Sequence, residues 1–118
     1  MKKTFFIILF FIYFTHFSFS QANESSVTGE GELYDEFRIA DKQLNVVYNK
    51  LKNKLDITDK TALINAQKAY LKFRELNCKF TSKEDSESGV IANKMKIDCL
   101  TQSTLERTKE LKDLIEYF

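Results

Sequence analysis

The chain contains no proline, no tryptophan, only three glycines and a single histidine, His16, among 118 residues. Without proline, nothing interrupts a helical pattern from within, and no Gly-rich loop is present that could cradle a phosphate group. Histidine is the commonest general base and the commonest neutral metal ligand. These absences argue against catalysis and against transition-metal binding, and we expect no cofactor.

Residues 1–20 have the pattern of a cleavable signal peptide. Lys2 and Lys3 give a positive start, and residues 5–14 form an unbroken apolar run. That run is too short for a transmembrane helix, which needs about 20 apolar residues, so export followed by cleavage is favoured over an uncleaved anchor. Cleavage is predicted after Ser20, with Ala22 as the alternative. The mature protein is then expected to be periplasmic or secreted.

Cleavage at this point changes the charge of the chain. It removes His16 and two lysines, which leaves 16 basic residues against 17 acidic ones and a net charge near −1. A chain of that charge lacks the electrostatic footprint of a protein that binds nucleic acid or an anionic membrane. The 98 residues that remain of the 118 are enough for one domain with one core.

Two cysteines, Cys78 and Cys99, remain in the exported chain. In an oxidising compartment they can form one intramolecular disulfide, which would close a loop of roughly 20 residues and add about 3 kcal/mol to the free energy of unfolding. A free buried thiol and an intermolecular bridge are the alternatives. Half of a metal site is the weakest alternative, because two thiolates with no histidine nearby do not complete a four-ligand set.

Apolar residues recur every three or four positions in three segments, which predicts three helices. After a polar lead-in at 21–31, they are expected at 32–55, 59–80 and 90–117. The first helix is expected to bury one uniform stripe, formed by Leu33, Phe37, Ala40, Leu44, Val47, Leu51 and Leu55. Short connections make sequential helices antiparallel neighbours, so the predicted fold class is all-α, a three-helix up-down-up bundle.

The second helix carries two competing stripes, and Thr58 or Asp59 is expected to cap its start. The more apolar stripe is predicted to form the core and consists of Ala62, Ala66, Ala69, Phe73, Leu76 and Phe80. Its three alanines indicate close approach to a neighbouring helix. The semi-polar stripe is predicted to lie at the core edge and consists of Leu63, Gln67, Tyr70, Arg74 and Asn77. The expected core face of the third helix is Ile97, Leu100, Thr104, Arg107, Leu111, Leu114 and Phe118.

Three charged residues, Asp41, Arg74 and Arg107, lie on or beside an apolar stripe in three different helices. We predict a half-buried polar network in which Asp41 lies between the two guanidinium groups, with Tyr70 at its edge. Such a network costs desolvation but can fix the register of packed helices. A structural role is therefore favoured over a role in binding.

Residues 81–89 form the one convincing internal loop, which is hydrophilic and ends in glycine. Its net charge is −2, and the disulfide would tether both of its flanks. Polar loops are usually just solvated, which is the favoured interpretation here, and a partner-binding role is the alternative. The candidate partner-binding residues are Lys83, Glu84, Asp85, Ser86, Glu87 and Ser88.

Three groups of residues, taken in their order along the chain, are similar to those of a known protein family. They are the stretch 40–45 with Tyr48 and Leu51, the stretch 66–70 with Phe73, Arg74 and Cys78, and Cys99 and Leu100 with Thr104, Arg107, Glu110 and Leu111. In this order and spacing the chain resembles the LprI-type lysozyme inhibitor family, small exported bacterial domains, over about residues 37–115. The resemblance implies an extracytoplasmic helical domain, here residues 32–118.

The resemblance also implies a protein partner, lysozyme, and we expect inhibition by occlusion of its active-site cleft. Lysozymes are commonly basic, so an acidic loop would steer association. The alternative function is a small cell-envelope structural or stress-related interaction module with another partner.

Overall fold

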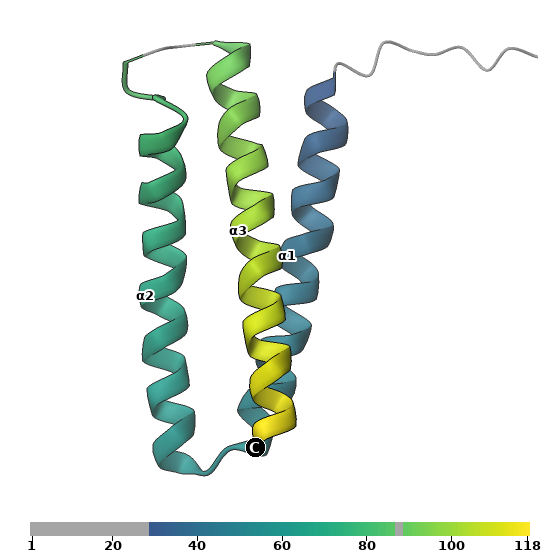
Figure 1. Ribbon diagram of the computed structural model, residues 1–118, viewed down its shortest axis with the longest axis vertical. Coiled ribbons are helices and arrows are strands. Elements are labelled where there is room, and N and C mark those ends of the chain that lie inside the picture. The colour runs from purple at the N-terminus through teal and green to yellow at the C-terminus, as the bar shows by residue number, and fades with distance from the viewer. Residues whose placement is uncertain (1–28, 87–88) are drawn as a thin grey trace, which may run out of the picture.

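The computed structural model describes residues 29–86 and 89–118, which form three helices, α1 (Gly29–Lys54), α2 (Ile57–Thr81) and α3 (Val90–Tyr117). The helices alternate in direction along the chain (Figure 1). No strand occurs in these two ranges. The predicted all-α bundle is therefore confirmed, and each helix begins and ends within three residues of its predicted bounds. The predicted signal peptide lies outside the described residues.

The starts of α2 and α3 follow from the residues that precede them. Asp56 caps α2, because its carboxylate accepts a hydrogen bond from the Asp59 backbone N–H at 2.9 Å. The predicted cap, Thr58 or Asp59, is therefore wrong, and α2 begins two residues early. Gly89 precedes α3 with a backbone φ of 123°, a conformation that glycine adopts without strain. That helix begins at Val90, as predicted.

The apolar core lies mainly between α1 and α3, which pack against each other most extensively. In α1, Ala40, Leu44, Val47 and Leu51 are buried, as the sequence pattern predicts. Leu44, Val47 and Leu51 form one cluster with residues of the other two helices, Leu63 and Leu111. In contrast, α2 contacts α3 much more than it contacts α1 (Figure 1).

Buried threonines allow α3 to pack closely within the bundle. Thr101, Thr104 and Thr108 are buried, and each hydroxyl donates to the carbonyl oxygen four residues earlier, at 2.9, 2.6 and 2.8 Å. These bonds satisfy the hydroxyls, so burying them costs little. Leu114 and Phe118, which were predicted to face the core, are 38% and 53% exposed. The predicted core face of α3 is therefore wrong at its C-terminal end.

The orientation of α2 differs from the prediction. The more apolar stripe faces outward, with Phe73, Leu76 and Phe80 being 63%, 59% and 80% exposed. The inward face is the semi-polar stripe, of which Leu63, Gln67 and Arg74 are buried. Cys78 is also buried, lies one helical turn after Arg74 on the same side of the helix, and has its disulfide partner on α3. The disulfide is therefore compatible with the observed orientation of α2 and not with the predicted one.

Candidate functional site

A disulfide between Cys78 and Cys99 joins the last turns of α2 to α3. The two Cα atoms are 5.5 Å apart, and Cys78 is fully buried. The predicted link between the second and third helices is confirmed, and both cysteines of the chain are used in it. The bridge lies in the last turn of α2 and at the tenth residue of α3, so it joins the two helices before and after the loop that connects them.

The first part of that loop, residues 82–86, is a tight turn held by its own hydrogen bonds. Ser82 is buried, and its hydroxyl donates to the Lys79 carbonyl oxygen at 3.1 Å. Lys83 adopts a left-handed backbone, with φ at 57°. Its carbonyl oxygen accepts bonds from the Ser86 N–H at 2.9 Å and the Ser86 hydroxyl at 3.2 Å. The turn therefore has a defined shape at the end of α2.

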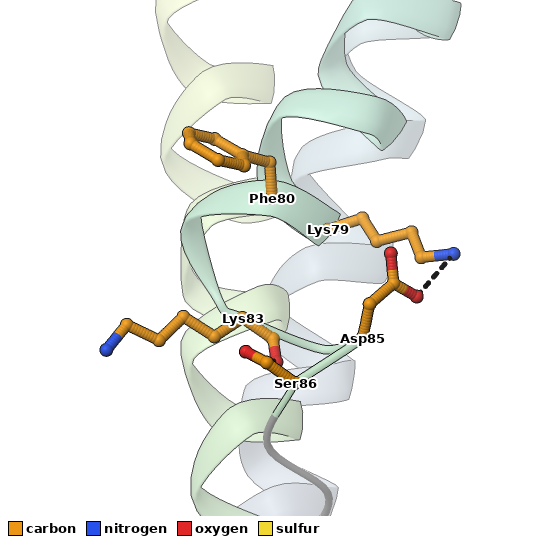
Figure 2. Close-up of a pocket in the computed structure, with 5 residues that line it drawn as sticks. All are labelled: Lys79, Phe80, Lys83, Asp85 and Ser86. Atoms are coloured by element: carbon orange, nitrogen blue, oxygen red, sulfur yellow. Dashed lines mark hydrogen bonds and ion pairs between the residues drawn. The ribbon is translucent and has the colours of Figure 1, made fainter.

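The acidic side chains of this turn are paired with lysines of the helices. The Lys79 ammonium lies 2.9 Å from an Asp85 carboxylate oxygen, as Figure 2 shows, and the Lys96 ammonium lies 2.8 Å from a Glu84 oxygen. The hydrogen bond and the charge of Asp85 raise the pKa of Lys79. These pairs offset much of the negative charge that the sequence gives to the loop. Glu87 and Ser88 lie outside the described residues.

A shallow hollow of about 350 Å³ opens beside the turn. Its lining residues are Lys79, Phe80, Lys83, Asp85 and Ser86. In Figure 2 the ammonium groups of Lys79 and Lys83 point to opposite sides, with the Phe80 ring above them. The turn thus presents the exposed Phe80 ring beside charged side chains.

The buried residue Arg74 connects all three helices. One of its terminal nitrogens donates to Asp41 of α1 at 3.0 Å and to the Thr104 hydroxyl of α3 at 2.7 Å. The guanidinium also stacks on the Phe37 ring, 5.4 Å from its centroid. Its Nε is buried and has no hydrogen-bond partner among the described residues. Arg74 thus fixes the relative positions of the three helices at a cost in unsatisfied polarity.

A second polar cluster surrounds Arg107. Its Nε donates to the Gln67 side-chain oxygen at 3.1 Å, and a terminal nitrogen donates to Glu110 at 2.9 Å. The guanidinium stacks on the Tyr70 ring at 5.2 Å. The Tyr70 hydroxyl donates to the Ser103 carbonyl oxygen at 2.6 Å, and burial raises the pKa of Tyr70 above its usual value. The hydroxyl therefore stays protonated and available as a donor at neutral pH.

The structure divides the predicted polar network into these two clusters. Asp41 pairs with Arg74, whereas the Arg107 guanidinium pairs with Glu110. The prediction that Asp41 lies between the two guanidinium groups is therefore wrong. The sequence-based prediction did not include three of the partners. These are Gln67, Thr104 and Glu110. The first two were visible in the sequence as polar residues on helical stripes, which is the signal that could have identified them.

We expect the substitution Arg107→Met to lower the free energy of unfolding by about 1–2 kcal/mol, because the buried Gln67 oxygen then loses its hydrogen-bond donor. Thermal unfolding followed by circular dichroism measures the loss. Binding to a partner should be retained if the cluster is structural. An unchanged melting temperature together with lost binding would instead assign Arg107 to the binding surface.

Neither a metal site nor a membrane span is found where the structure describes the chain. Within residues 29–86 and 89–118, no three histidine, cysteine or carboxylate side chains gather closely enough to hold a metal ion. None of the three helices is both long and apolar enough to cross a bilayer.

The described residues define a small helical domain stapled by one disulfide, with exposed loop and helix surfaces suited to contact a protein. The family model described as lysozyme inhibitor LprI matches residues 20–111, most of the chain. The chain belongs to this family, which confirms the resemblance. No curated protein and no solved structure matches the chain. The description of the family points to a protein partner, and the disulfide fits an oxidising compartment.

Proposed function

We propose that the protein is an exported binding protein that inhibits lysozyme by occluding its active-site cleft, without catalysis and without a cofactor. The observation that carries the proposal is membership of the lysozyme inhibitor family. The signal-peptide pattern of residues 1–20 and the disulfide support a periplasmic or secreted location. Residues 32–118 form the inhibitory domain in this proposal.

The turn at 82–86 is the part of the surface that we assign to the cleft. A lysozyme cleft contains two carboxyl groups, so an inserted loop must present a cation or a hydrogen-bond donor. Lys83 follows the C-cap of α2, and in Figure 2 its ammonium points to the opposite side of the turn from the Lys79–Asp85 pair. The pairing of Glu84 with Lys96 reduces the repulsion between the loop and the cleft.

The test is a cell-wall turbidity assay in which the exported protein is titrated against lysozymes of several classes. We expect the wild-type protein to inhibit at least one class, and Lys83→Glu to weaken inhibition by about tenfold or more, because like charges facing each other across an interface are strongly unfavourable. The matched control is Lys109→Glu, which makes the same charge change in an exposed ion pair of α3. This control should inhibit like the wild type.

Two results would count against the proposal at different levels. If the folded protein inhibits no lysozyme at micromolar concentration, the alternative of a cell-envelope interaction module replaces it. If the wild-type protein inhibits and both lysine variants lose the same amount of activity, the loss reflects net charge alone. The turn would then not be the surface that enters the cleft.

A further inference from the structure

The outward face of α2 is a continuous apolar stripe that residues 29–86 and 89–118 leave uncovered. Phe73, Leu76 and Phe80 are 63%, 59% and 80% exposed. The stripe continues toward the start of the helix through three exposed alanines, Ala62, Ala66 and Ala69. Within the described part of the chain, α2 packs with its opposite, semi-polar stripe against α3. The stripe therefore offers a helical docking face about five turns of helix long.

The stripe is complementary to itself when two copies meet in antiparallel orientation. The spacings along it are four, three, four, three and four residues, a series that is the same in both directions. Antiparallel alignment therefore sets Ala62 opposite Phe80, and each small residue opposite a large one. The other two pairs are Ala66 with Leu76 and Ala69 with Phe73. Parallel alignment would instead set alanine opposite alanine and phenylalanine opposite phenylalanine. The alanine pairs would leave gaps, and the phenylalanine pairs would clash.

We propose that this face of α2 binds the same face of a second copy of the protein, with a two-fold axis near residue 71. Such an interface is isologous, because each copy uses the same surface. The N-terminal end of each α2 helix then lies beside the C-terminal end of its partner, which brings the opposite partial charges of the helix ends together.

The exposed area indicates a reversible dimer. An aromatic side chain buries 150–250 Å² when it is fully covered, so the exposed parts of Phe73 and Phe80 amount to roughly 200–350 Å² in each copy. Leu76 and the three alanines add to this, yet the total stays below the roughly 800 Å² per partner of a standard interface. We therefore expect monomer and dimer to exchange at micromolar concentrations.

The test is sedimentation velocity of the exported, disulfide-bonded protein over a range from about 1 μM to about 1 mM, which spans the affinities expected for an interface of this size. The wild-type protein should shift from monomer to dimer. Ala69→Phe places phenylalanine against Phe73 of the partner, and Phe73→Ala leaves a gap there. We expect each change to weaken the dimer by about tenfold or more.

The deciding variant is the exchange Ala69→Phe with Phe73→Ala. It restores one small and one large residue at each pair, so dimerisation should return to within about threefold of the wild type, a difference below 1 kcal/mol. The matched control is Ile39→Ala, which removes an exposed apolar side chain from α1. This control should dimerise normally. Ala69 and Phe73 are both exposed. Equal melting temperatures of the wild type and all variants at low concentration check that every monomer remains folded.

A wild-type protein that stays monomeric at about 1 mM overturns the proposal, since that concentration exceeds the range expected for this interface. A dimer that is indifferent to the single substitutions overturns it as well, because another surface then holds the copies together. If the substitutions weaken lysozyme inhibition and leave sedimentation unchanged, the stripe belongs to the lysozyme interface instead. The outcome does not depend on whether the protein inhibits lysozyme, because sedimentation is measured without it.

Discussion

Replacing both cysteines, Cys78→Ala with Cys99→Ala, is expected to lower the free energy of unfolding by about 3 kcal/mol. The bridge closes a loop with a sequence separation of 21 residues, and a cross-link of that span removes about this much conformational freedom from the unfolded chain. For a domain of this size the melting temperature should fall by about 12–24 °C. Alanine is preferred to serine because Cys78 is fully buried and a hydroxyl there would lack solvent.

Thermal unfolding of the double variant, monitored by circular dichroism, measures the effect. The wild-type protein in the presence of a reducing agent is the second arm of the experiment and should melt at nearly the same temperature as the variant. Ser103→Ala is the matched control, because Ser103 lies beside the Cys78 sulfur without forming the bond. A loss of less than about 1 kcal/mol would mean that helix packing alone fixes α2 on α3 and that the cross-link contributes little.

The bundle itself could be predicted because the apolar spacing and the boundary residues of its helices are visible in the local sequence. Charged residues fill every face of α1 except one, so the buried positions Ala40, Leu44, Val47 and Leu51 follow from spacing alone. The bounds of α3 follow from Gly89 and from the absence of any later helix breaker. In these two helices the pattern leaves one choice of core face over most of the length.

In α2 the pattern leaves two choices, and hydrophobicity selects the wrong one. Spacing cannot decide whether Phe73 or Arg74 faces the neighbouring helices, because each lies on a regular stripe. The predicted disulfide could have decided which face of α2 is buried, because Cys78 lies on the same side of the helix as Arg74 and must face α3. Cys78 and Arg74 thus face the bundle together, and Phe73 and Phe80 face outward. The most apolar residues of the helix are left outside, where a second molecule can cover them.

Three of the polar residues could be predicted to lie near the interior, but their partners could not. Asp41, Arg74 and Arg107 all lie near the interior, as expected. Pairing depends on the relative shift of the helices along their axes, which no single helical pattern contains. With α2 placed as observed, Arg74 reaches Asp41, while Arg107 is one turn beyond Thr104 and reaches Glu110 on its own helix.

The Arg74–Asp41 ion pair should respond unequally to loss of its two members. The Arg74 side chain is 7% exposed, whereas that of Asp41 is 38% exposed. Asp41→Ala leaves a buried guanidinium without its nearest counter-charge, since the exposed Glu75 carboxylate is 3.9 Å away, and we expect a loss of about 3 kcal/mol in the free energy of unfolding. Arg74→Met leaves a carboxylate that water can reach and puts an apolar chain in the buried space. The expected loss is only about 1 kcal/mol.

Urea denaturation of the two single variants and the double variant forms a double-mutant cycle. Because the damage in Asp41→Ala comes from the uncompensated Arg74 charge, adding Arg74→Met should recover about 2 kcal/mol of the loss. The matched control is Asp35→Ala on the same helix, which breaks an exposed pair with Arg38 and should cost about 0.5 kcal/mol or less. Additive losses, or a larger loss for Arg74→Met than for Asp41→Ala, would contradict this account. The hydrogen bond to Thr104 and the stacking on Phe37 would then be what holds the helices in place, with the ion pair secondary.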